Sequence, residues 1–142
     1  MTHYVCFTGG RDTFGPAVDA AIDDVLHFLH LFYGVGLRVM HGDSEGVDRT
    51  AGRLAETRGI PVKAFPADWG RGRGAGPERN KKMAGLLLSW EQLGHSVEVI
   101  ALPGGRGTEH MVDFSTRLGL NVTQIPLDEP DEPVYEQPTL GV

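Results

Sequence analysis

The amino-acid sequence predicts an α/β fold built on one doubly wound parallel sheet of about five strands, in the order 3-2-1-4-5. Two observations support this prediction. Short apolar runs typical of buried strands alternate with amphipathic helical segments as far as about residue 126. Glycine accounts for 20 of the 142 residues, about twice its usual share, and many glycines directly follow the predicted strands. The length fits a single domain, so no second domain is expected.

The first half of the chain contains two strand–helix units. Residues 3–8 form an apolar run and are predicted as a buried strand. The next predicted element is a helix over 16–32, which starts with a proline, a residue favoured at the first helical position. Residues 37–41 are predicted as the second strand and residues 47–58 as the second helix. Gly59 is expected to end that helix, because glycine readily adopts the left-handed conformation that closes helices.

The second half of the chain continues the same alternation. Its predicted elements are the strand 62–65, the helix 77–89, the strand 97–102, the helix 107–118 and the strand 120–125. Strands that alternate with helices form a parallel sheet through right-handed crossovers, which place helices on both faces. The predicted architecture is therefore a single Rossmann-like domain.

The predicted domain comprises residues 1–126, and residues 127–142 form an acidic, proline-rich tail that we expect to be mobile. The chain has a net charge of -6, from 13 basic and 19 acidic residues. Five of the acidic residues lie in 128–142, so the remaining chain carries 13 basic and 14 acidic residues. Such a nearly neutral body argues against binding of duplex nucleic acid, which needs a strongly basic surface.

The chain carries no sequence feature of an exported or membrane protein. Cys6 is its one cysteine, so no intrachain disulfide can form, and its apolar surroundings predict a small core residue. The N-terminus lacks the basic and apolar regions of a signal peptide, and no apolar run approaches the roughly 20 residues that span a membrane. We therefore expect a cytoplasmic protein without a membrane partner.

Eight glycines lie in four loops, each of which follows a predicted strand. The loops are 8–12, 41–48, the loop that ends at 76–80, and 103–108. All four are expected at the same edge of a parallel sheet, and the first and fourth face each other where the strand order reverses. Backbone amides at such loops and at helix N-termini bind anions, and glycine lets a phosphate approach closely. The sequence therefore predicts a phosphate or nucleotide site at this edge.

Five motifs carry a resemblance to a known family. TGGRD, HGDSEGVD, ADW, GPERNKKM and PGGRGTEHM occur in this order, and together they resemble the YspA-like, cpYpsA-related branch of the SLOG superfamily over residues 3–126. The superfamily is more distantly similar to the Lonely Guy phosphoribohydrolases, also called lysine decarboxylase-like proteins, and to the core of DNA-processing protein A. The resemblance implies a Rossmann-like fold, a nucleotide-derived ligand over the PGGRGT loop and a homodimer.

The predicted ligand-binding residues divide by chemistry. Glycine amides and one hydroxyl are expected to donate to phosphate, arginines to supply charge, and Asp48 and Asp12 either to bind a ribose hydroxyl or to brace the loops. The full predicted set is Gly9, Gly10, Arg11, Gly42, Asp48, Arg79, Gly104, Gly105, Arg106, Gly107 and Thr108. No metal and no further cofactor are expected.

The same resemblance bears on catalysis. Lonely Guy enzymes cleave the N-glycosidic bond of nucleoside monophosphates, and their signature resembles PGGxGTxxE with an arginine on the preceding helix. Arg79 lies at the arginine position, but Asn80 replaces the usual lysine and Met111 replaces the acid. Without that acid near the sugar, binding for sensing or sequestration is the favoured function. Phosphoribohydrolase activity is the alternative, with Arg79, Asp48 and Asp12 as its candidate catalytic residues.

Residues 42–46 also fit the nucleophile-elbow pattern G-x-S-x-G between a strand and a helix, and His95 and His110 follow them. The chain is short for an α/β-hydrolase, and the family resemblance already accounts for these glycines. An esterase is therefore a weak hypothesis. The third function considered is a DNA-handling module, and the nearly neutral charge of the body speaks against it.

Overall fold

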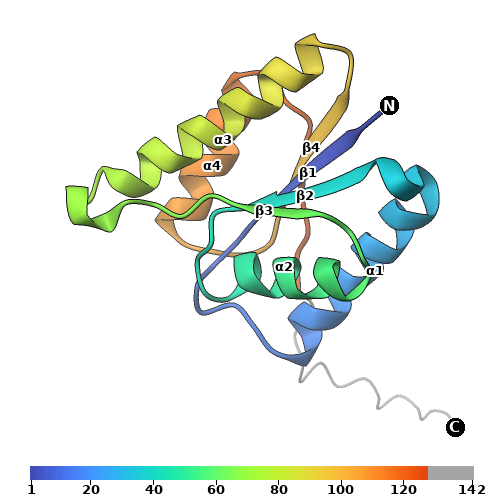
Figure 1. The fold of residues 1–142 in the computed structure, drawn as a ribbon. Coiled ribbons are helices and arrows are strands. Elements are labelled where there is room, and N and C mark those ends of the chain that lie inside the picture. Colours follow the sequence, from blue (N-terminus) through green and yellow to red (C-terminus); the bar gives the residue numbers. More distant parts are fainter. Residues whose placement is uncertain (128–142) are drawn as a thin grey trace, which may run out of the picture.

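The computed structural model describes residues 1–127, so the predicted tail over 128–142 lies outside the described residues. Five parallel strands form one sheet in the order β3-β2-β1-β4-β5 (Figure 1), which confirms the predicted fold class and strand order. The strands are β1 (His3–Thr8), β2 (Leu37–His41), β3 (Val62–Ala64), β4 (Ser96–Ala101) and β5 (Val122–Gln124).

Two pairs of helices cover the two faces of the sheet (Figure 1). The helices are α1 (Pro16–Tyr33), α2 (Val47–Thr57), α3 (Ala75–Gln92) and α4 (Arg106–Arg117), and two short 3-10 turns are η1 (Gly34–Gly36) and η2 (Trp69–Arg71). Helices α1 and α2 pack together on one face, and α3 and α4 pack together on the other. Among the described residues, no helix combines the length and the apolar character needed to cross a membrane.

The structure shifts several predicted boundaries. Helix α3 begins at Ala75, two residues before its predicted start at Pro77. A proline fits here because the amides of the first helical turn have no acceptor within the helix. Gly76, predicted in the preceding loop, therefore lies in the first turn of α3. Strand β5 is shorter than predicted, because only Val122–Gln124 pair with β4.

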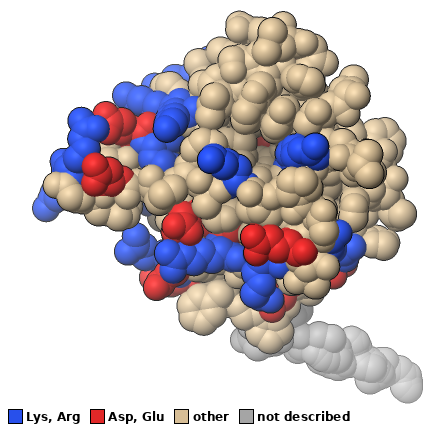
Figure 2. Space-filling view, viewed as in Figure 1, with Lys and Arg blue, Asp and Glu red and all other residues tan. Residues whose placement is uncertain are grey.

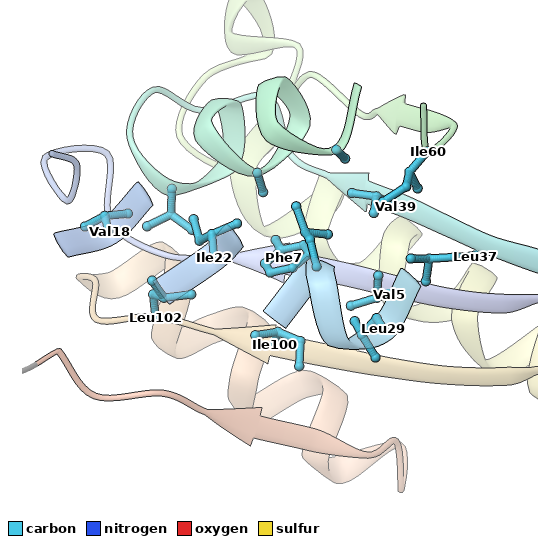
Figure 3. Close-up of a cluster of buried hydrophobic side chains, with 14 residues drawn as sticks. Val5, Phe7, Val18, Ile22, Leu29, Leu37, Val39, Ile60, Ile100 and Leu102 are labelled. Carbon is cyan, nitrogen blue, oxygen red and sulfur yellow. The ribbon is translucent and has the colours of Figure 1, made fainter. Parts of the chain in front are cut away.

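The central strand β1 separates two apolar layers, because successive side chains of a strand point to opposite faces. Val5 and Phe7 pack against α1 and α2 in the cluster that Figure 3 shows. Cys6 points the other way and packs with Met83 and Met111, from α3 and α4. Cys6 is fully buried, which confirms its predicted place in the core, and this burial raises the pKa of its thiol. Both faces of the sheet are thus filled before any ligand binds.

The loops that follow β1 and β4 are joined directly at the sheet edge. The Leu102 amide donates to the Thr8 carbonyl, and the Gly10 amide donates to the Pro103 carbonyl, each at 2.9 Å. These bonds continue the pairing of the two strands beyond their ends. They fix the two loops at the point where the strand order reverses, which is the usual place for a ligand in such folds.

Candidate ligand-binding cavity

A cavity of about 570 Å³ lies between the loops after β1 and β4 and the start of α3. Nine of the eleven predicted ligand-binding residues line it: Gly9, Gly10, Arg11, Asp48, Arg79, Gly105, Arg106, Gly107 and Thr108. Gly42 and Gly104 do not line it. The structure thus brings together most of a set that the sequence scatters over 100 positions.

Gly42 and Gly104 are needed for close packing below the cavity. A Cβ on Gly42 would lie 2.5 Å from Nη1 of Arg79, and a Cβ on Gly104 would collide with the Thr108 hydroxyl and the Gly10 amide. Both glycines thus have a structural role, and their predicted contact with the ligand stays a prediction. They let the arginine and the two loops come into contact.

Gly10 also has a structural role. Its amide donates to Pro103, and its carbonyl accepts from the amides of Thr13 and Val47 at 3.2 Å each. The predicted donation of this amide to phosphate is therefore not available in this structure. Gly46 completes the junction, because its φ of 79° is left-handed and a Cβ there would overlap the Gly10 carbonyl.

The N-terminus of α4 supplies the free amides that the glycine pattern predicts. Its first internal bond runs from the Glu109 amide to the Gly105 carbonyl, and no side chain caps the helix. The amides of 106–108 consequently have no backbone acceptor within residues 1–127. A Cβ on Gly105 or Gly107 would meet no atom within 4 Å. An anion at this helix end would gain both the amide hydrogen bonds and the helix dipole.

Arg79 and Asp48 hold the loop after β2 from two sides. Nη1 of Arg79 donates to the Gly42 carbonyl and, at 3.2 Å, to the Phe65 carbonyl. Oδ2 of Asp48 accepts from the Gly42 amide at 3.0 Å and from the Ser44 amide at 3.4 Å. Of the two roles predicted for Asp48, loop bracing is therefore observed. Arg79 also ties this loop to the segment after β3.

The other carboxylate oxygen of Asp48 has no hydrogen-bond partner in the described chain, and it is buried. The residue is only 5% exposed. Burial raises the pKa of this carboxyl to about 6, against the lowering by the Ser44 amide, by the nearby charge of Arg79 and by the Gly42 amide. Asp48, which lines the cavity, thus combines a bracing oxygen with a buried oxygen that has no partner in residues 1–127.

Asp12, the other predicted catalytic carboxylate, and Met111, which replaces the Lonely Guy acid, both lie outside the cavity lining. Asp12 is exposed in the turn after β1. Met111, at the position of the Lonely Guy acid, is fully buried in the apolar layer between the sheet and helices α3 and α4. Among the described residues, no three His, Cys, Asp or Glu side chains gather as a metal site would require.

The nucleophile-elbow pattern does not adopt the expected geometry. In such elbows the strained residue is the nucleophilic serine, whereas here the left-handed residue is Asp43, with a φ of 61°. The Asp43 amide donates to Nδ1 of His41 at 2.9 Å, which fixes this turn. No hydrogen bond within residues 1–127 joins the Ser44 hydroxyl to a histidine. The esterase hypothesis therefore gains no support.

Nine further lining residues were not in the predicted set, and four of them have side chains that suit ligand contact: Trp69, Arg73, Asn80 and His110. The Trp69 ring is 55% exposed and lies over Gly76, where a Cβ would come within 3.0 Å of it. Arg73 lies in a basic stretch, which was the available sequence signal. Asn80 and His110 face each other only because α3 and α4 pack side by side, and sequence spacing does not reveal that contact.

The cavity is positively charged within a negatively charged chain. Four arginines line it, namely Arg11, Arg73, Arg79 and Arg106, and Asp48 is the one carboxylate among its lining residues. In Figure 2, charged side chains gather over the start of α3 and along α2, and the upper part of the view carries few of them. Low-dielectric walls strengthen the field of these arginines, so the cavity is suited to an anion.

Residues 4–72 match the model described as YspA, cpYpsA-related SLOG family. These residues belong to the SLOG superfamily, as the resemblance predicts. The match spans β1 to η2 and contains three of the five motifs, namely TGGRD, HGDSEGVD and ADW. The second half of the domain, with α3 and α4, lies outside the matched residues.

The SLOG domain also resembles a solved structure, DNA processing protein A (DprA) from Streptococcus pneumoniae. The TM-score is 0.70 at 17% sequence identity, which shows a shared fold. The alignment covers 92% of this chain but 52% of the DprA chain, so the SLOG domain spans about half the length of that protein. No curated protein matches the sequence significantly.

Proposed function

We propose that the cavity binds a nucleotide or another nucleotide-derived phosphate ligand, for sensing or sequestration. One observation carries the proposal. The uncapped N-terminus of α4, with the free amides of 106–108, borders a cavity whose charged side chains are four arginines and one carboxylate. This combination favours a phosphate group over a neutral ligand.

The size and walls of the cavity fit a mononucleotide. Its volume of about 570 Å³ lies within the usual range for small-molecule sites. In the proposed pose, the phosphate contacts the amides of 106–108, with Arg11 and Arg106 beside it. The exposed ring of Trp69 is available to stack on the base. Arg79 supports this pose from below, because its guanidinium already holds two carbonyls.

A thermal-shift screen tests the proposal. AMP, GMP, CMP, UMP, cyclic nucleotides, ADP-ribose and NAD are added at millimolar concentration, and adenosine serves as the phosphate-free control. Because a ligand that binds only the folded state stabilises it, at least one phosphate ligand should raise the melting temperature. If no nucleotide changes the melting temperature, or if adenosine raises it as much as AMP does, the proposal is contradicted.

Phosphoribohydrolase activity is the second candidate, and Asp48 is the observation in its favour. A carboxyl with a pKa near 6 at the cavity wall has the protonation behaviour of a general acid or base. The buried Met111 speaks against the Lonely Guy mechanism. Incubation with each monophosphate should therefore release no free base. Release that Asp48→Asn or Arg79→Ala abolishes would establish the enzyme instead.

We also propose a cytoplasmic homodimer that does not bind nucleic acid. Phe28, Leu31 and Phe32 on α1 are each at least 67% exposed, which supports a contact between two copies. Light scattering should give twice the monomer mass.

DprA is named as a DNA processing protein, but the composition of this chain is not the strongly basic one of a duplex binder. Oligonucleotide binding with a steep salt dependence would contradict the exclusion of nucleic acid.

A further inference from the structure

We propose that His110 contacts the ligand as a neutral hydrogen-bond donor through Nε2, and that Asn80 is the positioning residue that fixes this tautomer. The inference rests on the proposed phosphate-binding function and adds a specificity-determining contact to it. The acceptor on the ligand would be a phosphate oxygen. His110 lines the cavity on the first turns of α4, two residues beyond the free amides of 106–108.

The orientation of the Asn80 amide follows from its neighbours. Nε of Arg79 is only a donor, and it lies 2.9 Å from Oδ1 of Asn80, so the oxygen of the amide faces Arg79. The NH₂ group must then face the other way. It donates to the Gly107 carbonyl at 3.1 Å and contacts Nδ1 of His110 at 3.2 Å. Asn80 is 4% exposed, so water does not compete for these bonds.

The tautomer of His110 follows from that orientation. Because the Asn80 NH₂ group only donates, Nδ1 of His110 must accept, and the ring proton resides on Nε2. A doubly protonated ring would place an N–H against the N–H of Asn80. Burial lowers the pKa of His110, which also disfavours a doubly protonated ring. The charges of Lys81 on α3 and Arg117 on α4 act in the same direction, whereas Asp113 opposes them more weakly.

A neutral donor at Nε2 of His110 determines which ligand groups can bind beside it. Nε2 makes no hydrogen bond to any residue in 1–127, so its proton is available to a ligand. Together with the free amides and the arginines, it presents donors to an acceptor-rich group such as phosphate. A ligand group that only donates, such as an amine, would find no acceptor at Nε2 of His110.

The tautomer is tested first in the ligand-free protein by NMR of the His110 ring. In the wild-type protein we expect the proton on Nε2 and a pKa below the ordinary ~6.5. Asn80→Asp should raise that pKa above 6.5, because a carboxylate accepts from a protonated ring, and Asn80→Ala should raise it part of the way. A wild-type ring protonated on Nδ1, or a pKa unchanged in both variants, overturns the inference.

The ligand contact is tested by AMP and inorganic phosphate binding at pH 7.5. His110→Ala should weaken both about tenfold, the usual effect of one hydrogen bond to a charged group. His110→Gln, which keeps a donor, should stay within about threefold, and the exposed His27→Ala is the matched control. If AMP binds wild type and His110→Ala equally, this inference fails and the proposed function stands. If AMP and phosphate do not bind the wild-type protein, both fail.

Discussion

At the scale of single residues, the cavity contains a carboxyl group that the fold satisfies only in part. Asp48 is buried, one of its oxygens has no partner within residues 1–127, and its pKa is raised to about 6. A buried polar atom without a partner costs free energy, and such a cost is often retained where a ligand supplies the partner. Asp48 therefore has a measurable signature even before a ligand is known.

That signature is a pH dependence of stability. The folded-state pKa of about 6 lies above the ordinary ~3.9 of an unfolded Asp. The stability that Asp48 contributes is thus fully present at low pH and is lost as the pH rises through 6. The difference in unfolding free energy between Asp48→Asn and wild type should therefore shift in favour of the variant by about 2 kcal/mol from pH 4 to pH 8. Urea unfolding at the two pH values measures this shift. The exposed Glu91→Gln is the control, and a shift no larger than that of the control refutes the raised pKa.

Gly105 allows a test of the site that spares the fold. A Cβ there would meet no atom within 4 Å, and the residue has an ordinary φ of -98°. Gly105→Val should therefore fold normally and place its methyl groups beside the free amides of 106–108, where they lower AMP affinity by at least about tenfold. Gly85 on α3 also has free space and lies outside the cavity, so Gly85→Val is the matched control. Equal AMP affinity of the two variants in calorimetry would place the ligand elsewhere.

At the scale of elements, the loops are held to one another by side chains as well as by backbone bonds. Arg79 on α3 reaches the carbonyls of Gly42 and Phe65, which follow β2 and β3. Gly42 has to lack a Cβ because the guanidinium fills that space. An arginine that resemblance assigns to a phosphate thus also determines where two loops lie.

This clamp predicts coupling between Gly42 and Arg79. Arg79→Ala leaves two carbonyls without their donor and should cost about 1–3 kcal/mol of unfolding free energy. Gly42→Ala should cost a comparable amount, because its Cβ displaces the guanidinium. In the double variant the clash is gone, so the combined cost should fall below the sum by at least about 0.5 kcal/mol. Strict additivity in urea unfolding would show that the clamp does not hold the loop.

The sequence predicts the helices and strands better than the side-chain contacts between them. The apolar run of β1 and the apolar spacing of α1 follow directly from patterning, and the structure confirms both. The glycines that follow four strands also allowed the prediction that the four loops lie together at one edge of the sheet. The pairing of Gly42 with Arg79 and of Asn80 with His110 could not be predicted. The first contact depends on where α3 lies against the loop after β2, and the second on how α3 packs against α4. Residue spacing along the chain encodes neither arrangement.

At the scale of the whole molecule, the segment that follows β5 packs against the core. Ile125 and Leu127 contact the apolar cluster beneath α1 and α2. The predicted domain boundary at 126 thus falls between two residues that help to close the core. We propose that the folded unit extends through Leu127.

Truncation tests this boundary. The acidic, proline-rich composition of 128–142 predicts a mobile tail, so a chain ending at Leu127 should match the full chain in melting temperature and AMP affinity. A chain ending at Gln124 loses both apolar side chains and should lose about 1–3 kcal/mol of unfolding free energy. Thermal and urea unfolding of the three chains provide the comparison. A large loss on removal of 128–142 alone would contradict the proposed extent of the folded unit.

The central claim is that the free amides at the start of α4 bind the phosphate of a nucleotide. Titration of AMP into the ¹⁵N-labelled protein measures this directly, residue by residue. The account predicts saturable shifts that are largest at the amides of 106–108 and that require at least about tenfold more AMP in Gly105→Val. Absence of any shift at millimolar AMP, or shifts confined to residues outside the cavity, would contradict it.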